Sequence, residues 1–291
     1  MRSTPLSLLT IVLGVLCVTL VAGPPRIKAA KHEPPLLPRP ELLTVLGNAQ
    51  RQMIADYYWI LTTEATGVAH TREEYRDVYD YALLISELDP KFQLVYSFAG
   101  AIIPVNLGRE TWVNTDESTQ ILSKGFALFP NYLFLRIMYA YNLSVFHKRY
   151  QQAADILKET AKMPGAPKYL GVLATRLYGQ AGAINAGLAL ATELSQSAAD
   201  PATRQTFERR TKELILEGEL QKIDQAIEEF KRTTGRMPAT GLELVASGQL
   251  REIPEDPLGG TIVIGADGRS HSSAAEDERL EIYDPKKKLQ D

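Results

Sequence analysis

The sequence predicts a mainly α-helical fold: an N-terminal transmembrane helix, an α-solenoid of paired antiparallel helices, and a small C-terminal α+β segment with a short antiparallel sheet. Three observations predict this order. Residues 6–23 form an almost entirely apolar run. Prolines then follow apolar-periodic segments at separations of about 34 to 40 residues, the period of paired-helix repeats. These prolines are Pro90, Pro130, Pro164, Pro201 and Pro238. After residue 235, turn residues separate short strand-like segments.

Length and composition exclude several classes of protein. The chain has 291 residues, of which 45% are hydrophobic, so it can bury a sizeable core. A net charge of -3 and a pI near 5.9 offer no basic face for nucleic acid. The single cysteine, Cys17, excludes a disulfide framework or a cysteine metal cluster within one chain. We therefore expect an ordered protein that binds no nucleic acid.

Residues 1–23 are predicted to be a membrane anchor or a signal peptide. The apolar run has about the minimum length that spans a bilayer. Leu20-Val21-Ala22 places leucine where a signal-peptide cleavage site needs a small residue, so an uncleaved anchor is favoured over a cleaved signal or a buried helix. Basic residues flank the run on both sides and leave its orientation open. From the commoner arrangement of such anchors, we expect a single-pass bacterial inner-membrane protein with a periplasmic soluble domain.

Residues 24–40 are rich in proline and basic residues. Six prolines alternate with Arg26, Lys28, Lys31 and Arg39. Such a composition favours an extended linker, at about 3.1 Å per residue in a polyproline-like form. The tail at 286–291, which contains three successive lysines, is expected to be disordered.

Glu41 to Thr66 is predicted to form one long helix. The cluster Tyr57-Tyr58-Trp59 in its middle either packs between helices or forms part of a partner surface, where tyrosine and tryptophan are enriched. Thr71-Arg72-Glu73-Glu74 is typical of a helix start, because a threonine hydroxyl can accept hydrogen bonds from first-turn amides.

Three pairs of helices are predicted next. The first pair is 91–106 with 117–129, the second 131–146 with 150–163, and the third 167–181 with 183–197. Each pair exposes apolar residues on two sides, so neighbours must stack, and we expect a superhelix with a concave face. Residues 201–234 carry alternating charges and are expected to close the stack as a solvated terminal cap.

The helix ends resemble those of tetratricopeptide repeats. Proline terminates segments in Glu87-Leu88-Asp89-Pro90, Ala127-Leu128-Phe129-Pro130 and Ala161-Lys162-Met163-Pro164. Lys148 to Leu157 is similar to the turn and the start of the second helix of that family. The resemblance implies a repeat domain over residues 41–234 that binds other proteins.

Residues 235–285 resemble the globular part of type II secretion and type IV pilin-like proteins. The resemblance rests on Gly235-Arg236-Met237-Pro238 at a helix end, the turn Ile253 to Gly260, the strand Thr261 to Ile264, and the hairpin signal Asp267-Gly268. Leu280 to Tyr283 is predicted to be the last strand. No prepilin-peptidase site precedes Leu6, so assembly as a pilin subunit is not expected. The acidic loop at 276–278 is expected to be solvated.

The sequence carries no recognisable catalytic or metal-binding motif. His32, His70, His147 and His271 are not at ligand spacing from one another or from a cysteine. A serine-centred nucleophile elbow and a phosphate-binding glycine loop are both missing. We therefore predict no enzyme activity, no cofactor and no metal.

The function predicted from these patterns is a binding scaffold. The membrane-anchored repeats would hold other proteins of an envelope complex of secretion or pilus type. The alternative is a structural accessory subunit of a stable membrane complex, and an enzyme is the third possibility. Aromatic residues on first helices of pairs are the predicted partner-binding residues. They are Tyr139, Tyr141, Tyr169 and Tyr178, together with Tyr57, Tyr58 and Trp59.

Overall fold

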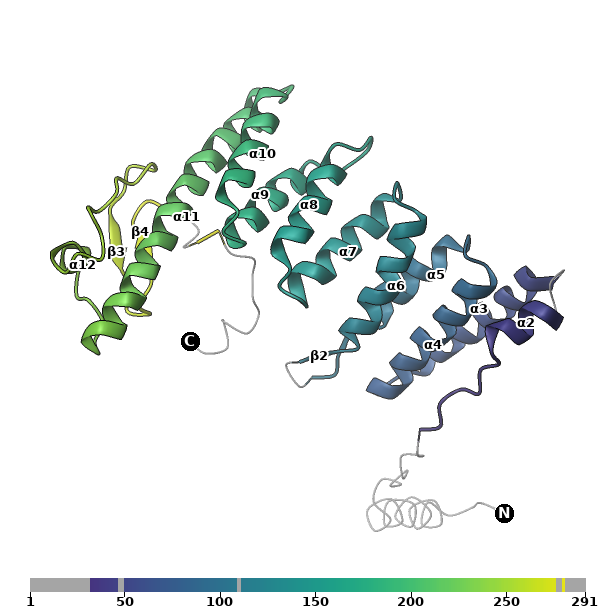
Figure 1. Cartoon of the computed structure of the whole chain (residues 1–291). Coiled ribbons are helices and arrows are strands. Elements are labelled where there is room, and N and C mark those ends of the chain that lie inside the picture. Colours follow the sequence, from purple (N-terminus) through teal and green to yellow (C-terminus); the bar gives the residue numbers. More distant parts are fainter. Residues whose placement is uncertain (1–31, 47–49, 109–110, 276–278, 281–291) are drawn as a thin grey trace, which may run out of the picture. The chain divides into compact units, whose positions relative to one another are not determined.

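The computed structural model describes residues 32–46, 50–108, 111–275 and 279–280 (Figure 1). The chain divides into two compact units, Met1–Pro35 and Leu36–Asp291. In the first unit the described residues, 32–35, form no helix or strand. The predicted membrane helix and the C-terminal tail lie outside the described residues, and no helix within these residues is long and apolar enough to cross a membrane. The second unit is mainly helical, as predicted, with eleven described helices and two small antiparallel sheets.

The first helices of this unit are α2 (Pro40–Leu46), α3 (Arg51–Val68) and α4 (Arg72–Leu88). The described parts of the helix predicted from Glu41 to Thr66 are α2 and α3, and residues 47–49 between them lie outside the described residues. At the start of α4, Thr71 Oγ1 accepts a hydrogen bond from the Glu74 amide and Glu74 Oε2 accepts one from the Thr71 amide, at 3.3 and 3.0 Å. This capping box confirms the predicted helix start.

The next pair contains a hairpin that the sequence analysis did not predict. α5 (Gln93–Ile102) is followed by β1 (Val105–Asn106), β2 (Trp112–Val113) and α6 (Thr115–Leu128). In the hairpin Val105 pairs with Val113 and Asn106 pairs with Trp112. The predicted helix over 91–106 therefore ends at Ile102. Asn114, with a left-handed φ of 57°, turns the chain into α6, and its Nδ2 donates to the Arg72 carbonyl at 2.9 Å.

The remaining helices begin and end close to their predicted limits. They are α7 (Leu133–Val145), α8 (Tyr150–Ala161), α9 (Tyr169–Gln180) and α10 (Ile184–Gln196). Pro130 and Pro164 follow the ends of α6 and α8. Pro201, in contrast, is the first residue of α11 (Pro201–Thr234), where its missing N–H costs no helical hydrogen bond. Asp200 caps this helix by accepting a hydrogen bond from the Thr203 amide at 2.8 Å.

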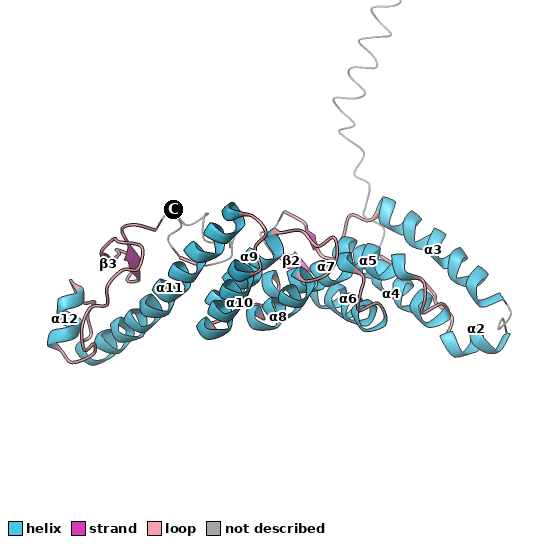
Figure 2. Cartoon of the chain, turned by 90° about the horizontal axis from the view of Figure 1, so that it is seen from above, coloured by secondary structure: helices cyan, strands magenta, loops and turns pink. Residues whose placement is uncertain are grey.

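These helices form two layers, as Figure 2 shows. One contains α3, α5, α7 and α9, here called the first-helix layer; the other contains α4, α6, α8 and α10, the second-helix layer. Each helix from α3 to α11 contacts the next one in the sequence. Contacts also join α4 to α6 and α5 to α7 within the layers. The antiparallel pairs therefore stack in chain order.

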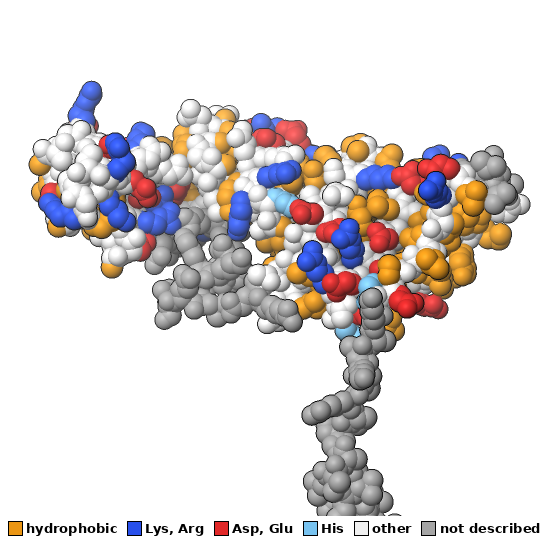
Figure 3. Space-filling model, turned by 60° about the horizontal axis from the view of Figure 1, so that its bottom comes forward, with side chains coloured by type: hydrophobic (Ala, Val, Ile, Leu, Met, Phe, Trp, Pro, Cys, Tyr) orange, Lys and Arg blue, Asp and Glu red, His pale blue; other side chains and the backbone are white. Residues whose placement is uncertain are grey.

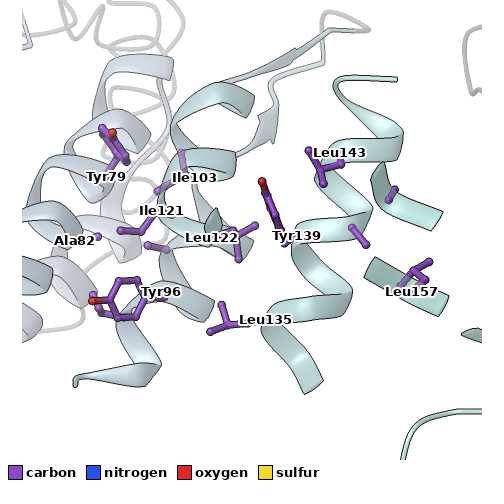
Figure 4. Packing of buried hydrophobic residues seen from close by; sticks show 14 of the residues in the cluster. Tyr79, Ala82, Tyr96, Ile103, Ile121, Leu122, Leu135, Tyr139, Leu143 and Leu157 are labelled. Carbon is purple, nitrogen blue, oxygen red and sulfur yellow. The ribbon is translucent and has the colours of Figure 1, made fainter. Parts of the chain in front are cut away.

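One hydrophobic core runs between the layers (Figure 4). Tyr96, Leu122 and Leu135 are fully buried in it, on α5, α6 and α7. Gly125 of α6 allows close approach to α5, because a Cβ at this position would lie 2.5 Å from the Cβ of Tyr96. A chain of polar contacts crosses the same helices. Asn142 Nδ2 donates to Ser118 Oγ at 2.6 Å, and Ser118 Oγ donates to the Gly100 carbonyl at 2.7 Å.

The C-terminal segment packs on the second half of α11. It contains α12 (Gly241–Ala246), β3 (Ile262–Ile264) and β4 (Ser270–Ser272), which pair antiparallel with Val263 opposite His271. Gly235, with a φ of 76°, ends α11, and the predicted hairpin at Asp267-Gly268 is confirmed. A separate small core holds the segment; it consists of Ile223, Ala226, Ile227, Phe230 and Leu244. Leu280 is not part of a strand, and residues 281–283 lie outside the described residues.

Candidate functional site

Large exposed hydrophobic side chains are concentrated on one layer. Among the described residues, four second-helix-layer helices expose one such residue, Leu128 at the end of α6. The first-helix layer exposes eight, which are Met53, Tyr57, Ile60, Val68, Leu94, Phe134, Tyr141 and Tyr169. Scattered exposed apolar residues are normal on a protein surface, but a contiguous set marks an interaction site. We call the outer side of this layer the first-helix face.

On α3 and α7 the exposed residues recur at helical spacing on one side of the helix. On α7, Phe134 and Tyr141 are exposed seven residues apart, with partly buried Met138 between them. On α5, Leu94 is exposed and Phe98, four residues further on, is partly buried; on α9, Tyr169 in the first turn is exposed. Residues at i, i+4 and i+7 lie on one side of a helix. Helices α3 and α7 therefore contribute apolar stripes to the first-helix face, and α5 and α9 contribute single exposed residues.

Charged residues are scarce on this layer. Helices α4, α6, α8 and α10 contain fourteen. Helices α3, α5, α7 and α9 contain five, namely Arg51, Asp56, Glu64, Arg136 and Arg176. Two of the five point toward the second-helix layer: Arg51 Nη2 donates to the Glu87 carbonyl at 3.0 Å, and Arg136 Nε donates to Thr160 Oγ1 at 2.7 Å. Depletion of charge with enrichment of aromatic residues and methionine characterises the centres of protein interfaces.

An aromatic cluster extends the face at the carboxyl end of α7. The ring centroids of Trp112 and Phe146 are 5.3 Å apart, and those of Tyr141 and Phe146 are 5.8 Å apart. Trp112 and Tyr141 are both exposed. The hairpin β1–β2 positions Trp112 here. Because two-residue strands have no detectable periodicity, the sequence pattern gives no signal for this tryptophan.

The seven predicted partner-binding residues divide by burial. Tyr57, Tyr141 and Tyr169 are exposed on the first-helix face. The other four pack against or within the core: Tyr58 and Trp59 are partly buried, whereas Tyr139 and Tyr178 are buried. Trp59 contacts the Phe98 ring at 4.9 Å between centroids and so joins α3 to α5.

Tyr178 fixes α9 against α8. Its hydroxyl donates a hydrogen bond to Asp155 Oδ1. Burial, together with the hydrogen bond and the charge of Asp155, raises the pKa of the Tyr178 hydroxyl. The hydroxyl therefore remains protonated at neutral pH and serves as a structural donor.

His147 lies in a polar chain that superficially resembles a catalytic triad. Its Nε2 is 2.8 Å from Thr119 Oγ1, and its Nδ1 is 3.7 Å from Asp116 Oδ1. Thr119 Oγ1 already donates its proton to the Thr115 carbonyl at 2.7 Å. When the Thr119 hydroxyl donates to this carbonyl, its oxygen serves as the acceptor for a ring N–H of His147. These contacts join the end of α7 to α6.

A buried ionic cluster anchors the end of the described chain. Arg279 donates from Nε and Nη2 to the two carboxylate oxygens of Glu217, at 3.0 and 2.7 Å, and from Nη1 to Asp224 Oδ2 at 2.6 Å. Burial acts to lower the pKa of the Arg279 guanidinium. The hydrogen bonds and charges of Glu217 and Asp224 have the larger, opposite effect, so the pKa is raised. Burial likewise acts to raise the pKa of Asp224, yet hydrogen bonds from Ser270 and Arg279 hold it below its ordinary value.

This cluster was also missed by the sequence analysis. Glu217 belongs to a charge-rich helix that was expected to be a solvated terminal cap, and its partner lies 62 residues further along the chain. Leu280 follows Arg279 into the core beside Gly179 and Leu214. The cluster holds residues 279–280 against α9 and α11, and we assign it a structural role.

Comparison with protein families, curated proteins and solved structures gives no match for this chain. Among the described residues, no group of three or more histidine, cysteine, aspartate or glutamate side chains is placed to hold a metal ion. The surface chemistry of the first-helix face is therefore the basis for assigning a function.

Proposed function

We propose that the protein is a membrane-anchored, extracytoplasmic scaffold of tetratricopeptide-like helical repeats, which binds helical segments of other proteins through its first-helix face. The observation that carries the proposal is the asymmetry between the layers, with eight exposed large hydrophobic residues on one and one on the other. The scarcity of charge on the same helices supports it, since burying unpaired charges in an interface is costly. The apolar stripes at i, i+4 and i+7 on α3 and α7 are suited to packing against a helix.

We further propose that the scaffold assists assembly of a bacterial envelope complex of secretion or pilus type. This part rests on the apolar run at residues 6–23 and on the order of elements after residue 200. A long helix ending at Gly235, a short helix and an antiparallel hairpin follow one another in the order expected for pilin-like proteins. The assignment to a complex of secretion or pilus type comes from the sequence resemblance alone.

The test is affinity purification from native membranes in mild detergent with quantitative mass spectrometry. The variant F134S/Y141S alters two exposed residues of the face and should leave the core intact. We expect it to lose its reproducible partners. The matched control is I215S/L242S, which replaces two equally apolar exposed residues on α11 and α12. Equal recovery of partners with both variants would overturn the proposal.

A structural accessory subunit of a stable membrane complex is the second candidate. The scarcity of charge on the first-helix face favours it, because permanent interfaces are more hydrophobic than transient ones. Partners of an accessory subunit should co-purify at fixed stoichiometry and stay bound during a long wash. Partners of an assembly scaffold should exchange with added labelled protein within that time.

A further inference from the structure

The side of α3 that carries its exposed apolar residues is here called the free side of α3. α3 is the first helix of its layer, and it packs on α4 and, through Trp59, on α5. Met53, Tyr57 and Ile60 are 65%, 57% and 55% exposed, and Val68 is exposed on the same side. Figure 3 shows hydrophobic side chains gathered at the end of the molecule that carries α2 to α4. Among the described residues, this side of α3 is therefore an exposed helix surface.

The exposed side of α3 has a defined register. Met53, Tyr57, Ile60, Glu64 and Val68 follow the spacing i, i+4, i+7, i+11 and i+15, so they form one continuous row. Such rows are the ridges that pack into the grooves of a second helix. At a rise of about 1.5 Å per residue, the row from Met53 to Val68 is about 22 Å long. A partner helix of about 15 residues would cover it.

The charged residues on the free side of α3 are both acidic. Glu64 interrupts the apolar row, and Asp56 flanks it; both side chains are exposed. Arg51, the single basic residue of α3, is directed toward α4 by its hydrogen bond to the Glu87 carbonyl. An acidic residue within an apolar seam selects a partner with a basic residue opposite it and rejects one with an acidic residue.

We propose that the free side of α3 binds an amphipathic helix of a partner protein whose apolar stripe is flanked or interrupted by lysine or arginine. This inference rests on the proposed scaffold function and names the kind of segment bound at one end of the face. A second copy of this chain fits less well, because pairing α3 with itself brings Asp56 and Glu64 close to the same carboxylates of the copy. Charge complementarity therefore favours a basic partner.

The test uses the full chain and two labelled helical peptides of sequence LKKLLKLLKKLLKL and LEELLELLEELLEL. Fluorescence anisotropy at low ionic strength should show the lysine peptide binding at least about tenfold more tightly than the glutamate peptide. The variant M53S/I60S should lose most of the binding. D56N/E64Q should weaken binding of the lysine peptide about fivefold or more and reduce its salt dependence.

Two matched control variants distinguish binding at α3 from nonspecific binding to acidic or apolar residues elsewhere on the chain. E208Q/E228Q removes two exposed carboxylates of α11, and I215S/L242S removes two exposed apolar residues elsewhere. Both should bind the lysine peptide as the wild type does. Equal loss with E208Q/E228Q and D56N/E64Q would overturn the inference. It would also be overturned by a dimer in sedimentation velocity that M53S/I60S dissociates, since a second copy would then be the occupant.

The scaffold and the α3 inference can fail separately. If F134S/Y141S loses its partners but the two peptides bind equally, the scaffold stands and the basic-helix inference falls. If the peptides discriminate as expected but F134S/Y141S retains every partner, α3 is a binding surface and the wider face is not.

Discussion

At the scale of single residues, two tyrosines on α7 show how helix register decides between core and surface. Tyr139 is 8% exposed and packs with Phe126 of α6, whereas Tyr141 is 46% exposed. Both were predicted to bind a partner, because both are aromatic and lie on a first helix. Residue type cannot separate them. Their spacing could have done so, since Tyr141 shares a helix side with exposed Phe134, and Tyr139 shares one with buried Leu135.

Buried tyrosines should make the stability of the fold depend on alkaline pH. Burial, followed by the charges of Glu87 and Asp89, raises the pKa of Tyr96 to about 12 from 10.0. The unfolded chain then releases this proton first, so unfolding becomes more favourable as pH rises from about 10 to about 12. We expect the stability of the wild type relative to Tyr96→Phe to be constant below pH 10 and to fall by about 1.4 kcal/mol per pH unit above it.

Urea titrations of both proteins at several pH values between 8 and 12 measure this difference. Other tyrosines and lysines titrate in both chains and cancel in the comparison. A difference that stays constant up to pH 12 would show that the hydroxyl of Tyr96 has an ordinary pKa.

Removing Arg279 should destabilise the fold strongly. Arg279→Met leaves Glu217, itself buried, without its bidentate partner, and such losses cost about 3–5 kcal/mol. The double variant E217M/R279M removes both charges and should recover part of this loss. Chemical denaturation of the three proteins gives the comparison. If the double variant were no more stable than the single one, an unpaired buried carboxylate would not be the cause.

At the scale of elements, the helix ends were predictable and the short strands were not. Thr71 with Glu74, and the prolines after α6 and α8, act within a few residues of the chain, so the sequence shows them directly. The strands of the hairpin β1–β2 have two residues each, too few to show alternation. The Arg279–Glu217 pair depends on tertiary contact across 62 residues. Local signals therefore define the helices, and long-range packing defines the rest.

The capping box of α4 provides a test at this scale. Thr71→Ala removes the hydroxyl that accepts from the Glu74 amide and should lower the free energy of unfolding by about 1 kcal/mol. Thr71→Ser keeps the acceptor and should lie within a few tenths of a kcal/mol of the wild type. Thermal and urea unfolding measure both. Equal stability of the alanine and serine variants would mean that the amide finds another acceptor.

At the scale of the whole molecule, stacking in chain order means that each helix pair depends mainly on its neighbours. The main core extends from Ala55 on α3 to Leu190 on α10, and the C-terminal segment has its own core around Phe230. Damage to the middle of the main core should therefore spread to adjacent helices before it reaches the segment beyond α11. Hydrogen exchange resolves this spread along the chain.

Leu135→Ala is the variant that tests this independence. Leu135 is fully buried between α5, α6 and α7, and its Cδ1 would lie 3.2 Å from a Cβ at Gly125. Its truncation leaves a cavity that costs about 2–5 kcal/mol. We expect amides of α5 to α8 to exchange faster, while those of α12, β3 and β4 keep wild-type protection. Leu244→Ala, in the smaller core, should give the reverse pattern. Uniform acceleration in both variants would indicate one cooperative unit, in which binding at the first-helix face would also stabilise the C-terminal segment.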